Sequence, residues 1–374
     1  MTSVSTAPPF RADHVGSLLR PDAVKAAREK WLDGNLDANE LRGIEDDAIR
    51  DVVRMQEAVG LHSITDGEFR RTSFHFDFLD RIEGVSAVLP RAPQPSPEGA
   101  KAQAFQPPQL KIVGRIRHAR PIELDGFTFL KSVTARTPKL TIPSPTMLLR
   151  GGRGAVSEQA YPDLDVYFAD VIDVYAAELK ALGDAGCGYV QFDDTNFAYL
   201  CDQRMRQAMR DRGEDPDELP RRYVRLINAV IAKKPASMTI CIHLCRGNMA
   251  GRWAAEGGYE PIAEAVFGNL AVDGYFLEYE SERSGGFEPL RFMPKSKKVV
   301  LGLVSSKVPN IETMDGLRRR IEEAGTFMAM DDMGLSPQCG FASGFQGNPV
   351  TEDIERRKLA LVVETASEVW GTLQ

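Results

Sequence analysis

His243 and Cys245 are the residues of this sequence that are best suited to chemistry. They come directly after an apolar run at 238–242 that predicts a short buried strand, and Arg-Gly-Asn then ends the strand. Because residues i and i+2 of a strand point to the same side, we expect the imidazole and the thiol to lie next to each other. Zinc accepts both of these ligand types. A lone His-x-Cys is more often a core histidine and a buried cysteine, so the rest of the sequence must decide.

Eight apolar, strand-like segments alternate with helical patterns along the chain. The segments are residues 12–17, 62–65, 139–142, 189–192, 238–242, 274–277, 298–304 and 335–340. Helical periodicity fills most of the intervals, for example from Leu164 to Leu182. Eight βα repeats predict that residues 1–374 form a single α/β domain, a (β/α)8 TIM barrel. An open doubly wound sheet is the alternative, but no Gly-x-Gly-x-x-Gly follows the first segment.

One segment, residues 81–135, interrupts this alternation. It holds six prolines between positions 90 and 108, and then an alternating stretch at 110–116. The first part predicts a loop and the second part predicts a hairpin. We therefore expect an insertion between strands two and three, and we expect it to extend over the barrel mouth.

Residues that could bind a metal ion or take part in catalysis gather where the predicted strands end. In TIM barrels, the active site is built from residues at the C-terminal ends of several strands. The residues at these ends are Ser17, Glu68, Asp193, His243, Cys245, Glu278 and Cys339. A single carboxylate or cysteine there would more often cap a helix or pack in the core. Their joint placement favours a zinc site with His, Cys, Glu and Cys ligands.

The composition favours a soluble protein of the reducing cytoplasm. The net charge of −7, with no run of Lys and Arg, argues against a nucleic-acid surface. No stretch of about 18 apolar residues predicts a membrane span, and the first residues lack the features of a secretory signal. The five cysteines are widely spaced and odd in number, which argues against a disulfide framework.

Six motifs spread over most of the chain carry a family resemblance. They read FRADHVGSLLRP, SITDGEF, YVQFDD, HLCRGN, FLEYE and LSPQCGF. In combination they resemble the C-terminal catalytic barrel of cobalamin-independent methionine synthase, and more closely its short bacterial paralogues. The resemblance implies a zinc-dependent enzyme that moves a methyl group to the thiol of homocysteine and so produces methionine.

The resemblance also implies a role for individual residues. The implied zinc ligands are His243, Cys245, Glu278 and Cys339, with Glu280 as the substitute for Glu278. The implied contacts of the amino-acid thiol are the turn from Val15 to Ser17, together with Glu68 and Asp193. We assign Asp193 a catalytic role as well. Zinc would convert the substrate thiol, which is mostly protonated at neutral pH, into a nucleophilic thiolate.

The residues expected to hold the methyl donor depart from the family pattern. Ser305-Ser306-Lys307 stands in place of Asp-x-His, Arg150 in place of a Trp that stacks on the pterin, and Phe341-Ala342-Ser343 where the family has Leu-Lys-Thr-Arg. We expect these residues to line the half of the mouth opposite the zinc. Arg150 and Lys307 would favour a small or anionic donor over a folate. Lys307 is predicted to act as a general acid or to hold an acidic donor, although an exposed lysine at a strand end fits equally well.

Three functions stay open at this point. The first is methyl transfer to homocysteine, with a methylated folate, a methylated corrinoid on a partner protein or a small methylated metabolite as donor. The second is alkyl transfer to another thiol, as in the epoxyalkane:coenzyme M transferases, which resemble this family. The third is a non-catalytic zinc-binding protein, although storage would favour closed coordination and several sites. We interpret His75 as a core histidine and leave the role of His14 open.

Overall fold

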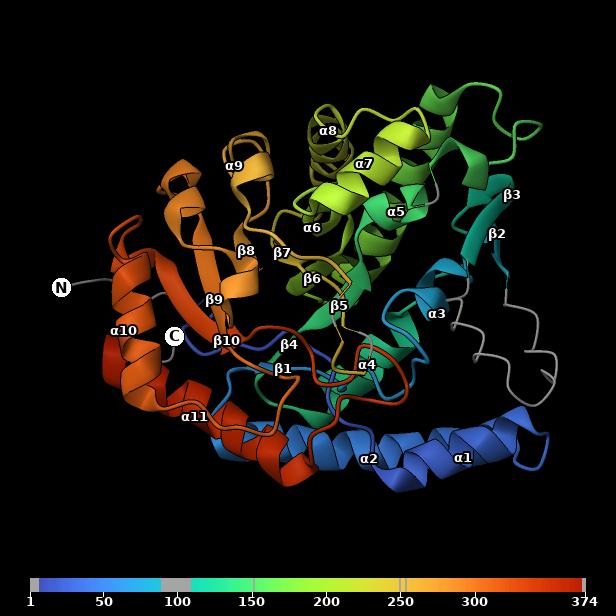
Figure 1. Cartoon of the computed structure of the whole chain (residues 1–374). Helices are drawn as coiled ribbons and strands as arrows, with labels where there is room; N and C mark the ends of the chain where they lie inside the picture. The colour runs from blue at the N-terminus through green and yellow to red at the C-terminus, as the bar shows by residue number, and fades with distance from the viewer. Residues whose placement is uncertain (1–6, 89–108, 151, 249, 253, 372–374) are drawn as a thin grey trace, which may run out of the picture.

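A six-stranded parallel sheet forms the centre of the computed structural model, which describes residues 7–88, 109–150, 152–248, 250–252 and 254–371 (Figure 1). In spatial order the strands are β10-β9-β8-β7-β6-β5. Their bounds are β5 (Leu140–Pro143), β6 (Tyr189–Asp194), β7 (Thr239–Leu244), β8 (Gly274–Glu278), β9 (Lys298–Val304) and β10 (Met333–Pro337). Nearly every residue of these strands is buried, as is typical of parallel sheets that are covered on both faces.

The first two predicted strands contribute less regular pairing. β1 (Ser63–Ile64) pairs in parallel with β4 (Thr137–Pro138), which leads directly into β5. At the other edge of the sheet, Ala12 forms a parallel bridge with Leu335 of β10. The same N-terminal segment also reaches the β1 side, since the backbone N–H of Leu18 donates to the carbonyl of Gly67 at 3.0 Å. The predicted α/β class with a parallel sheet is therefore confirmed.

Helices surround the strands (Figure 1). The α-helices are α1 (Asp22–Leu32), α2 (Ala38–Val59), α3 (Phe76–Leu79), α4 (Leu124–Val133), α5 (Leu164–Asp184), α6 (Asn196–Tyr199), α7 (Gln203–Asp211), α8 (Leu219–Ile231), α9 (Glu260–Val266), α10 (Met314–Ala324) and α11 (Glu352–Trp370). Short 3-10 helices are η1 (Pro145–Leu149), η2 (Arg153–Ala155), η3 (Glu282–Ser284), η4 (Glu288–Phe292) and η5 (Met330–Asp332). Helix α2 shows why these bounds arise, because an Asp37–Glu40 capping box starts it and Gly60, at φ 101°, ends it. No helix in the described ranges is long and apolar enough to cross a membrane.

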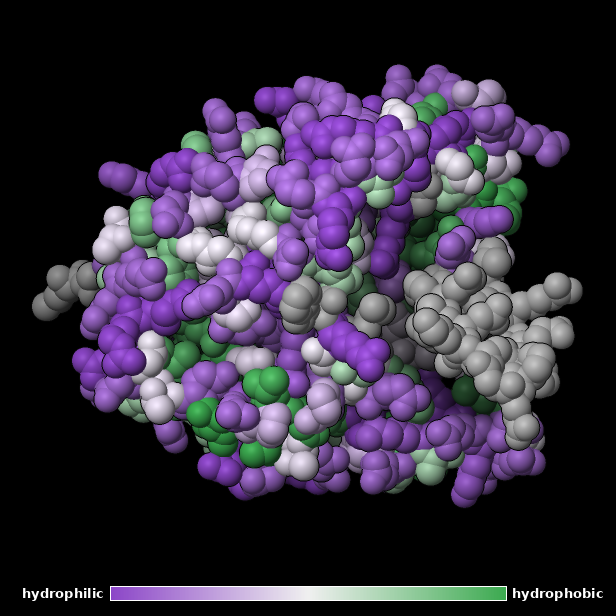
Figure 2. Space-filling model, viewed as in Figure 1, coloured by the Kyte–Doolittle hydropathy of each residue, from purple (hydrophilic) through white to green (hydrophobic). Residues whose placement is uncertain are grey.

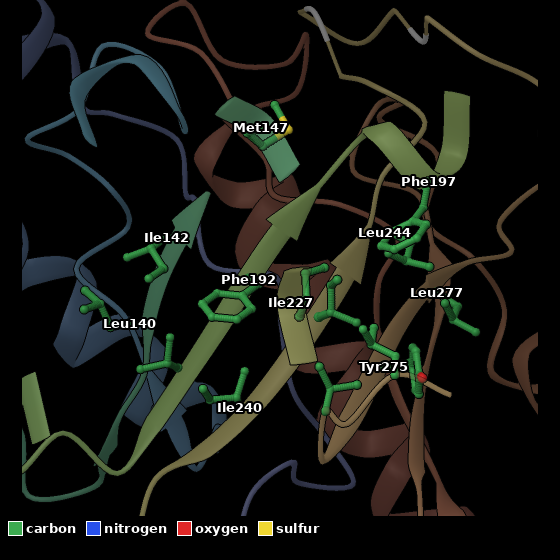
Figure 3. Close-up of a cluster of buried hydrophobic side chains, with 14 of the residues drawn as sticks. Leu140, Ile142, Met147, Phe192, Phe197, Ile227, Ile240, Leu244, Tyr275 and Leu277 are labelled. Atoms are coloured by element: carbon green, nitrogen blue, oxygen red, sulfur yellow. The ribbon is translucent and has the colours of Figure 1, made fainter. Parts of the chain in front are cut away.

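Alternate residues of each strand face two different environments. One set packs against the helices and forms the large core shown in Figure 3, with side chains such as Ile142, Phe192, Ile240 and Leu277. The intervening residues point to the opposite side, where Val15, Tyr189, Cys241, Phe276 and Val300 form a second cluster. Thr141, Gln191, Asp193, His243 and Glu278 belong to this second set by alternation. These five polar residues thus lie on the side away from the helices.

The inner side also holds a fully buried ion pair. The Lys139 ammonium lies 3.0 Å from Asp13 Oδ1, and it lies over the ring of Phe276 at 4.0 Å. The hydroxyl of Tyr189 donates to Asp13 Oδ2 at 2.8 Å, and that of Ser63 donates to Asp13 Oδ1 at 2.6 Å. A buried charge is tolerated only when it is paired and hydrogen-bonded, and here both conditions are met. The pair fixes the N-terminal segment against β5 and β6.

The interruption at residues 81–135 contains an antiparallel pair, β2 (Glu83–Val88) with β3 (Gln109–Arg117). This pair lies against α5, and Arg115 of β3 forms an ion pair with Asp170 of α5 at 2.7 Å. The prolines predicted to form a loop lie at 90–108, outside the described residues. A position of this segment over the mouth stays a prediction. The face of the molecule in Figure 2 is mostly hydrophilic, with apolar residues in small separate groups.

Candidate metal centre

Three of the predicted metal ligands come together at the ends of β7 and β10. Ligand atoms of His243, Cys245 and Cys339 all lie within 4.8 Å of one another, and the three side chains are buried. The two sulfurs are 3.1 Å apart although 94 positions separate them in the sequence. His243 and Cys245 share the inner side because they are two residues apart at the end of a strand. The predicted juxtaposition of imidazole and thiol is therefore present.

The chemistry of this group fits a zinc ion. Nδ1 of His243 lies 3.3 Å from the carbonyl of Phe276, and the tautomer that donates to this carbonyl leaves Nε2 as the metal-binding atom. The hydrogen bond from Cys339, followed by that from His243, lowers the pKa of the Cys245 thiol well below its ordinary value despite burial. Two sulfurs and an imidazole nitrogen form a donor set that binds zinc in preference to magnesium or calcium.

Glu278, the fourth predicted ligand, is not part of this three-residue group. Its Oε1 atom contacts Arg283 and lies 3.3 Å from the Lys307 ammonium, while Oε2 accepts from the backbone N–H of Arg246 at 3.0 Å. Burial would raise the pKa of Glu278, but Lys307, Arg246 and Arg283 lower it to about 2. Glu280, the substitute, lies 3.3 Å from Arg283 and 3.9 Å from Lys307. Both carboxylates are thus engaged by cations beside the metal group.

The predicted amino-acid contacts form a second group of buried residues. Glu68 adopts a left-handed backbone conformation with φ 60°, which is uncommon outside glycine and typical of functional sites. Its Oε1 accepts from Thr141 Oγ1 at 2.8 Å, and its Oε2 has no hydrogen-bond partner among the described residues. Thr141 can lie this close to the Gly16 backbone because Gly16 has no side chain. At φ 135°, a β-carbon on residue 16 would lie 2.5 Å from Thr141. Glu68 therefore offers a buried acceptor without a partner.

Asp193 connects this second group to the metal group. Gln191 Nε2 donates both to Asp193 Oδ1 at 2.7 Å and to the carbonyl of Val15 at 2.6 Å. Burial raises the pKa of Asp193 to about 7, partly opposed by His243 and reinforced by the nearby Glu68 carboxylate. The imidazole of His243 and the carboxylate of Glu68 therefore both influence the pKa of Asp193.

Of the residues predicted for the donor half of the mouth, those after β9 lie against the loop after β10, since Ser306 Oγ donates to the carbonyl of Gly340 at 3.1 Å. Arg150 is exposed and donates to the hydroxyl of Tyr199 at 2.8 Å. Lys307 is buried next to Glu278, so its predicted position opposite the metal residues is wrong. The reason is the sheet order: β8 and β9 are neighbours, which brings the residues after β9 beside the end of β8. Phe341 and Ala342 are buried packing residues.

Two arginines near the metal group were not identified from the sequence. Arg246 follows Cys245 and is fully buried, and its side chain bonds the carbonyl of Glu278 at 3.1 Å and the hydroxyl of Tyr259 at 3.0 Å. Its position directly after a predicted ligand was a usable signal. Arg283 gave no such signal, because a loop carries it back to Glu278. His75 is buried between the rings of Phe74 and Phe76, in agreement with its interpretation as a core histidine.

Comparison with known proteins identifies the family. Residues 10–367 match the family described as cobalamin-independent synthase, catalytic domain. The uncharacterized protein YxjH of Bacillus subtilis is 42% identical over 364 residues, which cover 97% of this chain and 95% of YxjH. A methionine synthase of Pyrococcus furiosus is 24% identical over 84% of this chain and 83% of its own length.

A solved structure agrees with this result. It belongs to a candidate vitamin-B12 independent methionine synthase of Listeria monocytogenes, which is 37% identical and has a TM-score of 0.78. The match covers 98% of this chain and 100% of the Listeria chain. The resemblance seen in the six sequence motifs is thereby confirmed. The chain belongs to the family of cobalamin-independent synthase catalytic domains.

Proposed function

We propose that this protein is a zinc-dependent methyltransferase that methylates the thiol of homocysteine to give methionine. The observation that carries this proposal is that a group of metal-binding residues lies close to a group of buried carboxylates. A buried His, Cys and Cys set suited to zinc lies within electrostatic reach of Asp193, which in turn neighbours Glu68. One group suits a thiolate and the other suits an ammonium, and homocysteine carries both. The named methionine synthases among its relatives support the same reaction.

We also propose that the strands close into a (β/α)8 barrel. The N-terminal segment supports closure, since it bridges to β10 through Ala12 and contacts the β1 side through Leu18. Inward residues of β6 to β9 form one cluster, and the buried Lys139–Asp13 pair lies against it at Phe276. In such a barrel the ends of β6, β7, β8 and β10 would form one mouth.

In the proposed site, His243, Cys245 and Cys339 would hold the zinc, and Glu278 is the fourth predicted ligand. Zinc, when bound, would make the substrate sulfur a thiolate at neutral pH. The protein's own residues would orient the amino acid: Glu68 Oε2 would accept from its ammonium, and the Val15–Ser17 turn would border its carboxylate. Asp193, which lies within electrostatic reach of Glu68, would be a second acceptor for the ammonium.

The same arrangement argues against the two alternatives. Coenzyme M carries no ammonium, so it offers no cationic partner to the buried Glu68 and Asp193. A storage protein would need several closed sites, whereas the described residues contain one candidate metal group. The residues that the family uses for folate are absent, and of the two predicted donor cations Arg150 is exposed, whereas Lys307 is paired with Glu278. We therefore propose a small or anionic donor, with a methylated corrinoid protein as a second candidate.

Product analysis tests this proposal. Purified zinc-loaded protein is incubated with homocysteine and, in separate reactions, methyltetrahydropteroyl-triglutamate, methylcobalamin and small methylated metabolites, and methionine is measured by mass spectrometry. We expect methionine with at least one donor, and the folate to support less than about 1 turnover per second. Coenzyme M in place of homocysteine is the acceptor control. Absence of methionine with every donor would refute the proposed reaction. Turnover with the folate above this rate would show that the folate is the natural donor.

A further inference from the structure

We propose that Gln191 is a further residue that selects the thiol substrate: it positions the Asp193 carboxylate and offers its own Oε1 atom to the α-ammonium of the amino acid. This inference rests on the proposed function and deepens it by assigning another residue to recognition of homocysteine. The ammonium would then meet Glu68 Oε2, Asp193 Oδ2 and Gln191 Oε1, one acceptor for each of its N–H bonds.

Gln191 links the two groups that are proposed to contact the amino acid. It is fully buried in β6 and comes two residues before Asp193, so both side chains lie on the inner face of the strand. Phe192, between them, points into the core on the helix side (Figure 3). Gln191 Nε2 donates to Asp193 Oδ1 at 2.7 Å and to the carbonyl of Val15 at 2.6 Å. The amide therefore connects the Asp193 carboxylate to the turn at residues 15–17.

These two bonds determine the orientation of the Gln191 amide. The opposite orientation would place the amide oxygen against the Val15 carbonyl and the Asp193 carboxylate, which are both acceptors. In the orientation with donors at both positions, Oε1 is buried and has no hydrogen-bond partner among the described residues. A buried amide oxygen without a partner is costly, and in a native protein it requires an explanation. The substrate ammonium would supply the missing donor.

The two neighbouring carboxylates are also open to a donor. Glu68 Oε2 is buried without a partner among the described residues. Gln191 donates only to Oδ1 of Asp193, and no hydrogen bond within the described part of the chain reaches Oδ2. The Glu68 carboxylate lies within electrostatic reach of Asp193. Two carboxylates and an amide oxygen suit a cation with several N–H bonds, because a buried charge must be both paired and hydrogen-bonded.

The turn at residues 15–17 does not depend on Gln191 alone. Thr65 Oγ1 and the backbone N–H of Phe341 donate to two of its carbonyls, at 2.6 and 2.8 Å. Loss of the Gln191 amide should therefore leave the turn in place. The effect should be confined to the contacts of the ammonium.

The test compares two ligands on the zinc-loaded wild-type protein and on Gln191→Met. Homocysteine is the first, and 4-mercaptobutyrate, which keeps the thiol and the carboxylate but lacks the α-ammonium, is the second. Calorimetry measures both affinities. We expect the wild type to prefer homocysteine, and Gln191→Met to bind it roughly 10- to 100-fold more weakly, as for the loss of one charged hydrogen bond. The affinity for 4-mercaptobutyrate should change by no more than about twofold.

Asn228→Leu is the matched control variant. The Asn228 amide also bonds two backbone groups, the carbonyl of Asn269 at 2.8 Å and the N–H of Ala271 at 2.7 Å, but it belongs to α8, in the layer of helices around the strands (Figure 1). Its loss should change neither affinity. Gln191→Asn provides a second site variant if the methionine variant does not fold. Its amide is one methylene shorter and cannot bond both Val15 and Asp193, so homocysteine should again bind more weakly.

The possible outcomes separate this inference from the proposed function. If the wild-type protein binds homocysteine no more tightly than 4-mercaptobutyrate, the ammonium site is refuted, and the proposed acceptor with it. If the wild type prefers homocysteine and Gln191→Met keeps that preference in full, only the role of Gln191 is refuted. An equal loss of affinity for both ligands in Gln191→Met would indicate a merely structural role and would also refute it.

Discussion

Ser17 Oγ lies directly against Gly340, so closely that a β-carbon on Gly340 would be 1.9 Å from it. The backbone carbonyl of Ser17 also accepts from the N–H of Phe341 at 2.8 Å. The turn proposed to hold the amino acid therefore packs on the loop that carries Cys339. The two halves of the proposed site are therefore in direct contact through Ser17.

Gly340→Ala should disturb this contact. The added methyl overlaps with Ser17, so we expect a loss of about 1–3 kcal/mol in the free energy of unfolding and reduced zinc content. Chemical denaturation and metal analysis measure these two effects. Gly344→Ala is the control, because a β-carbon there meets nothing within 4 Å. A Gly340→Ala protein with wild-type stability and full zinc would contradict this account of the contact.

Zinc content should depend on two of the five cysteines. As purified, the protein should hold about one zinc per chain, and Cys245→Ser or Cys339→Ser should lose most of it. Cys187→Ser and Cys201→Ser should keep it, because both thiols lie apart from the metal group and burial raises the pKa of each to about 12. Metal analysis of the four variants decides the assignment. Equal zinc in all of them would show that the ligands are wrong.

Binding of homocysteine should depend on Glu68 and Asp193 without loss of zinc. Glu68→Ala or Asp193→Ala removes a charged partner of the ammonium, so we expect binding to weaken by roughly 1.5–3 kcal/mol. Calorimetry on the zinc-loaded variants measures this loss. Asp170→Ala in α5, which breaks the ion pair with Arg115 of β3, is the control. Unchanged homocysteine binding in both site variants would favour a thiol without an α-amino group.

Glu355 in α11 should make stability depend on pH. Burial raises the pKa of this carboxyl to about 8, although it accepts from the backbone N–H of Leu19 at 2.8 Å and Glu352 adds to the shift. A raised pKa in the folded state means that Glu355 contributes its full stability below pH of about 4.5. This contribution is lost as the pH rises towards 8, by roughly 1 kcal/mol for each pH unit.

Glu355→Gln should remove this dependence, since the amide stays neutral and its oxygen can still accept from Leu19. Urea unfolding between pH 5 and pH 9 compares the two proteins. We expect the variant to gain stability relative to the wild type as the pH increases. A constant difference over that range would show that Glu355 does not titrate as its surroundings indicate.

The inner residues of the strands could be predicted from the sequence, because successive side chains of a strand alternate between its two faces and this depends only on local structure. Once 238–242 is taken as a strand, the placement of His243 and Cys245 on one side follows from the period of two. The same reasoning places Asp193 on the inner side of β6. These positions need only the strand and its direction, and both follow from short apolar runs between helices.

The ion pairs around the metal group could not be predicted in this way. Lys307 and Glu278 are 29 residues apart, and which cation reaches the carboxylate depends on sheet order and on long, flexible side chains. The short ladder of β1 is another example. Its two residues pair with β4, and no propensity in the sequence shows that pairing stops there.

The separation of Cys245 from Cys339 has a consequence for biosynthesis. During translation, Cys245 leaves the ribosome 94 residues before its partner thiol, Cys339. A nascent chain that has not reached β10 carries only two of the three residues of the metal group, and its N-terminal segment has no Leu335 with which to pair. Because contacts this distant in sequence form late, we expect metal loading to follow release of the nearly complete chain. Truncated translation products should therefore not compete with the finished protein for the cell's zinc.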